Sequence, residues 1–275
     1  MNIKKYALFL VLLILFFNSG AQNIGQIGDS IKNYTDINGM KQGNWKTLYP
    51  NGNLAYEGYF KNDKPLGAFK RYYENGKIQS ESFFYDNSKY ASVMMYNNAT
   101  RKIASGRYID KLKDSVWHYY ADNGTLILIE QYDAGKMTGE SKLYFYPSGE
   151  LSEVTNYEDG VKHGVYEKYY LDGTLRLRTK YCHGVMCDTL FTYHTNGVKE
   201  SETPYSNNRR DGVEKNYDDK GRLLSSVPYK EGVCQDPEQA KKESAEVERL
   251  LKNKGRYMES SQMQEPLDFL RKMQP

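Results

Sequence analysis

A 24-residue repeat is the feature that most constrains this 275-residue chain. Glycines of the kind found in turns recur at steps of 24 or 25 residues, and one step of 48 residues has Thr100 where a glycine would stand. The glycines are Gly52, Gly76, Gly124, Gly149, Gly173, Gly197 and Gly221. A fixed period of this length is the signature of a repeat protein, whose units each pack on their neighbours. The sequence therefore predicts eight units over residues 43–234.

Two columns of mainly aromatic residues keep the same period. Counted from the turn glycine, position −4 holds Leu48, Tyr72, Tyr96, Tyr120, Phe145, Tyr169, Tyr193 and Tyr217. Position +8 holds Phe60, Phe84, Tyr108, Tyr132, Tyr157, Tyr181, Tyr205 and Tyr229. The segments around these residues are rich in β-formers and too short for helices, so each unit is predicted to be a β-hairpin. We expect the two columns, with Tyr72, Tyr120, Tyr169, Tyr181 and Tyr193 as members, to be structural ladders.

The turn sequences favour a three-residue loop with a left-handed glycine, as in YPNGN at 49–53. Such a loop would pair position −4 with position +2, which is mostly leucine or isoleucine. Position +8 is expected to share that face. The sequence thus predicts one apolar face made of positions −4, +2 and +8.

The predicted fold is all-β: an elongated, open antiparallel sheet of about sixteen strands. An N-terminal cap is expected at residues 22–42, with a half-repeat at 34–43. Asp236 and Pro237 are typical of a helix N-terminus, so residues 235–275 are predicted to form a short helical cap. A second, weaker helix is expected around Met263 and Leu270. These helices would cover the last hairpin and protect an open sheet edge.

Residues 1–21 have the pattern of a secretory signal peptide. Lys4 and Lys5 precede an apolar run from Tyr6 to Phe17, and Ser19 and Ala21 are small residues at a cleavage site. The alternative is a retained anchor, for which the run is short. We therefore expect export to the periplasm, the outer envelope or the medium after cleavage.

Three cysteines remain after export, in a compartment that permits disulfides. Cys182 and Cys187 flank a predicted turn, so a bridge between them is one interpretation, and a free pair is the other. Cys234 would stay free.

No enzymatic or metal-binding pattern is found, and no cofactor is expected. The four histidines, His118, His163, His183 and His194, occupy different positions of the repeat, so we expect them to stay separate and not to stack into a site. His163, Cys187 and Asp211 share one position, but successive repeats lie about 10 Å apart, too far for a common metal ion. The chain also lacks a nucleophile elbow, a phosphate-binding loop and an HExxH motif.

The repeat units resemble the MORN-repeat variant of bacterial proteins, with its G-x-W/Y…YY-x-x-G-x-L pattern. The segments GVYEKYYLDGTLRLRTKYCHG at 164–184 and GAFKRYYENGKIQSESFF at 67–84 carry the resemblance, which extends over residues 43–234. Proteins of this make-up are grouped with the YwqK-type antitoxin component of a toxin–antitoxin module. The resemblance implies an open β-sheet that binds partners and no catalytic residues. An export signal departs from what an intracellular antitoxin needs.

The less regular positions −7 and −3 are predicted to face away from the apolar ladders. Early repeats carry aromatic residues there, and the candidate binding residues are Trp45, Tyr49, Phe69, Tyr73 and Trp117. Later repeats hold Lys142, Glu214, Asn97 or Asp218 at the same positions, so the fold alone would not demand aromatics. The alternative is that both faces of a single-layer sheet need apolar pairs.

The expected function is a non-catalytic, exported scaffold for an unidentified protein partner. Binding of envelope glycans through exposed aromatic rings is the alternative. Residues 22–275 contain 36 basic and 35 acidic side chains, so neither nucleic acid nor an anionic membrane is expected as a partner.

Overall fold

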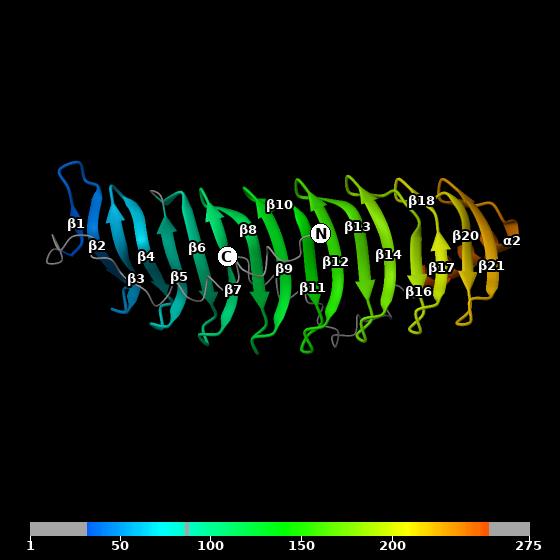
Figure 1. The fold of residues 1–275 in the computed structure, drawn as a ribbon, viewed down its shortest axis with the longest axis horizontal. Coiled ribbons are helices and arrows are strands. Elements are labelled where there is room, and N and C mark those ends of the chain that lie inside the picture. Colours follow the sequence, from blue (N-terminus) through cyan, green and yellow to red (C-terminus); the bar gives the residue numbers. More distant parts are fainter. Residues whose placement is uncertain (1–31, 86–87, 253–275) are drawn as a thin grey trace, which may run out of the picture.

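The computed structural model describes residues 32–85 and 88–252. These residues form one long single-layer sheet of 20 strands, a separate two-stranded sheet and a helix at the C-terminal end (Figure 1). The first half contains β1 Tyr34–Thr35, β2 Lys41–Leu48, β3 Leu54–Lys61, β4 Lys64–Tyr72, β5 Ile78–Tyr85, β6 Tyr90–Tyr96, β7 Lys102–Ile109, β8 Leu112–Tyr120, β9 Leu126–Asp133, β10 Lys136–Met137 and β11 Gly139–Tyr144. The second half contains β12 Leu151–Glu158, β13 Val161–Tyr169, β14 Leu175–Cys182, β15 Val185–Met186, β16 Leu190–Tyr193, β17 Lys199–Thr203, β18 Tyr205–Ser206, β19 Arg209–Arg210, β20 Gly212–Tyr217, β21 Leu223–Lys230, β22 Val233–Cys234 and α2 Pro237–Lys252.

The all-β repeat fold is as the sequence predicts, because eight hairpins follow one another in an antiparallel sheet. Every ladder is antiparallel, for example β2 with β3 and β3 with β4. Four of the sixteen predicted strands are each divided in two by a short break: β10 and β11, β15 and β16, β17 and β18, β19 and β20. One break falls at Pro204, which has no amide N–H for the ladder. Twelve undivided strands, eight halves, β1 and β22 account for the 22 strands.

The tight turns follow the predicted loop. Leu48 pairs with Leu54 and Tyr72 with Ile78, which are positions −4 and +2 in each hairpin. The turn glycine is left-handed, with φ of 85° at Gly52, and Thr100 takes the same conformation with φ of 62°. Thr100 therefore occupies the glycine position of a complete repeat unit.

The predicted face of position +8 is wrong, whereas positions −4 and +2 share one face and position −7 lies on the other, as predicted. In the first hairpin the register shifts next to Leu48: Leu48 opposes Leu54, but Thr47 opposes Tyr56, so Ala55 is an extra residue in its strand. A one-residue bulge reverses the direction of every later side chain in that strand. Position +8 therefore lies on the same face as position −7, and positions −4 and +2 lie on the opposite face.

The contacts of Phe60 show this arrangement directly. Its ring lies 6.2 Å from the ring of Trp45 and 5.9 Å from that of Phe69, at positions −7 of the first and second repeats. Leu48, at position −4, is exposed instead. We call the face that carries positions −7, +6 and +8 the aromatic face, and the one that carries −4, +2 and +5 the opposite face.

The fifth repeat corrects a second assignment. Its extra residue lies within the turn, because Tyr144 pairs with Leu151 and the amide of Gly149 bonds to the carbonyl of Phe145. Phe145 is thus a turn residue, and Tyr144 holds the ladder position. Ser141, opposite Thr155, stands where Lys142 was expected, so Lys142 is no example of a charge at position −7.

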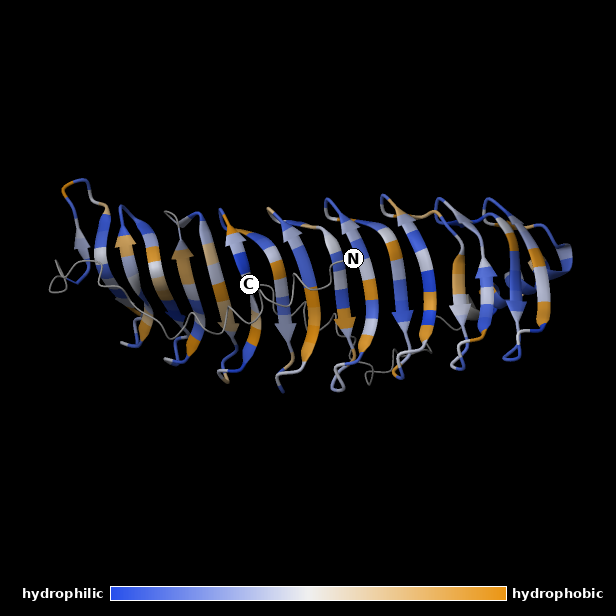
Figure 2. Ribbon diagram, viewed as in Figure 1, coloured by the Kyte–Doolittle hydropathy of each residue, from blue (hydrophilic) through white to orange (hydrophobic). Residues whose placement is uncertain are grey.

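Size complementarity between neighbouring strands builds the core of the aromatic face. Phe69 lies against Gly58, and Trp117 against Gly106, because a Cβ added to either glycine would lie 2.3 Å from a ring atom. Trp117 is only 1% exposed, although the sheet is a single layer. Hydrophobic and hydrophilic residues alternate along the strands (Figure 2).

The two ends of the sheet are closed differently. At the N-terminal end, the short strand β1 pairs with β2. At the other end, the carboxylate of Asp236 accepts a hydrogen bond from the amide of Gln239. Asp236 is therefore the N-cap of α2, as predicted. Figure 1 places α2 beside the last hairpin. The predicted signal peptide at 1–21 and the second C-terminal helix lie outside the described residues.

Candidate functional site

The five predicted binding residues divide into a core set and a set of inter-repeat ties. Phe69 and Trp117 are buried, so their rings fill the aromatic face. The Trp117 indole N–H donates to the carbonyl of Arg107 at 3.0 Å. Trp45 is partly exposed and donates to the carbonyls of Tyr34 and Gln42 at 3.2 and 3.1 Å. Packing thus explains the aromatics at position −7 without a ligand.

Residues at position −3 tie successive turns together. The hydroxyls of Tyr49 and Tyr73 donate to the carbonyls of Tyr72 and Tyr96 at 2.7 Å each. Tyr170 makes the same bond to the carbonyl of Tyr193 at 2.8 Å. Tyr49 and Tyr73 therefore connect each hairpin to the next.

A basic side chain lies over the aromatic face in several repeats, at position −11. The Nζ atoms of Lys41 and Lys113 lie 4.7 and 5.0 Å from the ring centroids of Trp45 and Trp117. Such cation–π contacts are worth about 0.5–2 kcal/mol each. Burial lowers the pKa of Lys113, whose ammonium donates to the Tyr119 hydroxyl at 2.6 Å. The aromatic face is thus covered in part by cations of its own chain.

The opposite face carries a repeated tyrosine–glutamate contact. Tyr72 donates to Glu57 at 2.7 Å and Tyr96 to Glu81 at 2.9 Å, each across a boundary between repeats. Burial and the adjacent carboxylate raise the pKa of Tyr72 to about 12, and the same causes raise that of Tyr96 to about 12. The position −4 ladder is therefore held by hydrogen bonds rather than by an apolar layer.

The other members of the predicted ladders make polar contacts on the opposite face or pack their rings on the aromatic face. Tyr169 donates to Glu167 at 2.6 Å, and Tyr120 accepts from Lys102 at 3.3 Å, both on the opposite face. Tyr193 pairs with Lys199 across its turn. Tyr181, at position +8, packs edge-on against Tyr166 with centroids 5.7 Å apart, on the aromatic face. The bond of Tyr169 lies within its own strand, although Tyr169 also pairs with Leu175 across its turn, and the other contacts join different strands.

Exposed apolar side chains gather on the opposite face of the first two repeats. Tyr59 is 45% exposed and lies directly across from Leu66, which is 38% exposed. In the next hairpin Phe83 and Tyr85 are 45% and 49% exposed, with ring centroids 4.7 Å apart. We call Tyr59, Leu66, Phe83 and Tyr85 the apolar patch. Exposed apolar side chains that cluster in this way are typical of an interaction surface.

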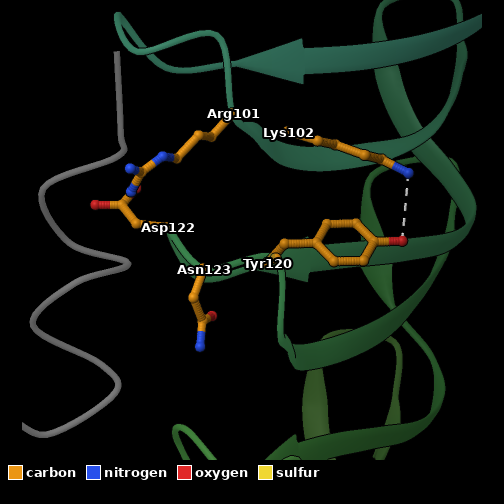
Figure 3. A pocket seen from close by; sticks show the side chains of 6 residues that line it. Arg101, Lys102, Tyr120, Asp122 and Asn123 are labelled. Atoms are coloured by element: carbon orange, nitrogen blue, oxygen red, sulfur yellow. Dashed lines mark hydrogen bonds between the residues drawn. The ribbon is translucent and has the colours of Figure 1, made fainter.

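A shallow hollow lies beside the turn of the fourth repeat. Figure 3 shows Arg101 and Asp122 pointing to one side of it and Tyr120 and Lys102 to the other. Lys102 lies 4.5 Å from the Tyr120 ring centroid, so both groups are already engaged with each other. The hollow holds no buried acid–base pair and offers no chemistry of its own.

Cys182 and Cys187 form a disulfide, and Cys234 is the free thiol. The bridge closes a loop that contains His183. The rings of His163 and His183 lie 4.8 Å apart, and Glu158 lies 3.5 Å from the former. The expectation that the histidines stay separate is therefore wrong for this pair. His163, Cys187 and Asp211 do not form a site, since Cys187 is bridged and Asp211 pairs with Lys230 at 3.0 Å.

Two features of the structure were not predicted from the sequence. The apolar patch includes Tyr59 and Phe83, which both stand at position +7. That position holds no aromatic residue in the later repeats, so a pair in the first two repeats was the only available signal. His163 and His183 stand at unlike positions in the repeat, and only the stacking of neighbouring hairpin turns brings them together. Within the described residues, no helix is both long and apolar enough to cross a membrane.

Comparison with protein families supports a MORN-repeat protein. The model described as MORN repeat variant matches residues 41–62, 65–87, 162–183 and 210–231. The model described as Histone H3 K4-specific methyltransferase SET7 N-terminal matches residues 108–162. No curated protein matches the chain. Each MORN-variant segment covers about one hairpin of the sheet, and the SET7 segment lies between the second and the third of them.

Proposed function

We propose that this chain is an exported, non-catalytic scaffold that binds a protein partner through the opposite face of its first two repeats. MORN repeats generally mediate interactions with proteins or membranes, which is compatible with such a role. The single observation that carries the proposal is the apolar patch, whose four side chains are each between 38% and 49% exposed.

Ion pairs on the same face give the apolar patch polar surroundings. Lys46 and Glu57 pair at 2.8 Å and Lys70 and Glu81 at 3.2 Å on the same face. Apolar centres surrounded by satisfied polar groups are usual in protein–protein interfaces. Paired charges also argue against a surface that selects a strongly anionic partner.

The test compares capture of partners by the wild-type chain and by a patch variant, Tyr59→Thr with Phe83→Thr. Threonine keeps the preference for a strand and removes the ring. Val213→Thr, at a 43% exposed valine of the last repeat, is the matched control. In cross-linking from an envelope extract, the patch variant should lose a specific partner that the control retains, with equal melting temperatures. Unchanged capture by the patch variant would contradict the proposal.

Glycan binding predicts a different result, which is retention of the wild-type chain on envelope polysaccharide. Two of the rings expected to serve it, Phe69 and Trp117, are buried, so the proposal favours protein. The YwqK-type antitoxin resemblance gives a narrower form of the proposal, in which the partner is a toxin-like protein. A toxin-like gene next to the gene for this chain would support that form.

A further inference from the structure

We infer that Glu158, His163 and His183 form a binding site for a divalent transition-metal ion such as Zn²⁺. One ligand atom from each side chain can be chosen so that all three lie within 4.8 Å of one another. Two imidazoles and one carboxylate form a ligand set that Zn²⁺ uses when a fourth coordination position stays open.

The three side chains come from two neighbouring hairpin turns. Glu158 ends β12 just before a tight turn, His163 lies early in β13, and His183 lies in the turn after β14. The amide of Gly184 donates to the carbonyl of Lys162 at 2.8 Å, which fixes the second turn against the start of β13. The stacking of turns along the sheet therefore brings the ligands together.

The disulfide restrains one of the ligands. His183 directly follows Cys182, and the bridge to Cys187 closes the loop around it. His183 is also left-handed, with φ of 48°, and its amide lies 3.4 Å from Nδ1 of His163. A restrained backbone lowers the conformational entropy that a ligand loses on metal binding.

The spacing fits one ion after small side-chain rotations. Zinc–nitrogen and zinc–oxygen bonds of about 2.0–2.2 Å place any two ligands of one ion at most about 4.4 Å apart. Glu158 and His183 are exposed, so their side chains can close the remaining few tenths of an ångström. Nδ1 of His163 and a carboxylate oxygen of Glu158 already face each other at 3.5 Å. A metal cation between these two electron-rich atoms would stabilise that approach.

Isothermal titration with ZnCl₂ tests the site on the tag-free, oxidised chain in a Cys234→Ser background, which removes the free thiol. We expect one Zn²⁺ per chain and a rise in melting temperature with zinc. His183→Asn should weaken binding by about tenfold or more, and His163→Gln likewise. Asparagine suits the left-handed position, and Asn207 occupies the corresponding turn of the next repeat with φ of 49°.

His194→Gln is the matched control for adventitious binding to histidine, because His194 lies in another turn and contacts the carbonyl of Tyr217. This variant should bind zinc as the background does. The inference would be overturned if no zinc bound, or if His183→Asn and His163→Gln bound it with the affinity of the control.

Discussion

Trp117 lies flat against Gly106 of the neighbouring strand, and any side chain at position 106 would displace its ring. A Cβ at position 106 would lie 2.3 Å from Trp117 Cδ2 and 2.4 Å from Cε2. On its other sides the indole meets Tyr108, with centroids 5.0 Å apart, and the ammonium of Lys113. Glycine thus lets an aromatic ring be buried in a sheet that has no second layer.

Gly106→Ala should therefore destabilise the chain by about 1–3 kcal/mol, because the indole must move out of a well-packed position. Ser82→Ala is the matched control, since Ser82 stands at the same position of an earlier repeat and opposes the smaller Val93. Urea denaturation would measure both variants. Equal stability of Gly106→Ala and the control would show that the ring can shift without loss.

Alkaline pH should weaken the contacts between repeats. The pKa of Tyr72 is raised to about 12 by burial and by Glu57, whereas an unfolded tyrosine titrates near 10. Since the folded pKa is the higher one, this contribution is complete below about pH 10 and is lost as the pH rises through about 12. Tyr96 behaves alike, because its pKa is also raised to about 12.

The double variant Tyr72→Phe with Tyr96→Phe should be less stable than wild type at pH 8, with a difference that shrinks between about pH 10 and 12. Tyr85→Phe, at a ring that is 49% exposed, is the control. Urea denaturation at each pH provides the comparison. A difference that stays constant up to pH 12 would mean that these hydroxyls do not respond as described.

Acid should act on Glu202, which joins the last two repeats. Hydrogen bonds from Lys199 at 2.8 Å and Lys215 at 2.9 Å lower the pKa of Glu202 to about 2. Because the folded pKa is the lower one, the stabilisation is complete above the unfolded value of about 4.5 and is lost as the pH falls through about 2.

Glu202→Gln should therefore lower the free energy of unfolding at pH 7 and flatten its dependence on pH between about 5 and 2. Glu200→Gln, at an exposed carboxylate two residues earlier, should leave both unchanged. Thermal unfolding across this pH range measures the effect. If the stability of Glu202→Gln fell as steeply between about pH 5 and 2 as that of the control, other carboxylates would be responsible for the loss.

The sequence predicted the repeat, the hairpins and the pairing across each turn, because these depend on a fixed period and on local glycine chemistry. It could not predict which face holds the core. That depends on an extra residue in the strand, such as Ala55, and no residue type at this position predicts a bulge. For the same reason, the buried Trp117 was predicted to be a binding residue, and the exposed Phe83 was not predicted to be one. The meeting of His163 with His183 depends on stacked turns, which one repeat unit does not reveal.

The charge of Glu214 at position −7 has a structural reason at the end of the sheet. Glu214 lies 3.4 Å from Arg210, which pairs with Glu243 of α2 at 3.2 Å. The Arg210 guanidinium also lies 3.7 Å from the ring centroid of Tyr229, whose hydroxyl donates to Glu243. At the last of the eight repeats, a polar network that holds the helix takes the place of the aromatic contact.

Glu243→Ala should release α2 from the last hairpin, because it removes the acceptor of both Arg210 and Tyr229. We expect a cost of about 1–3 kcal/mol, since the pair is only partly exposed. Amide hydrogen exchange of residues 237–249 should become faster, whereas Glu248→Ala, at an exposed position of the same helix, should change it little. If both variants exchanged at the wild-type rate, contacts other than Glu243 would have to hold the helix on the sheet.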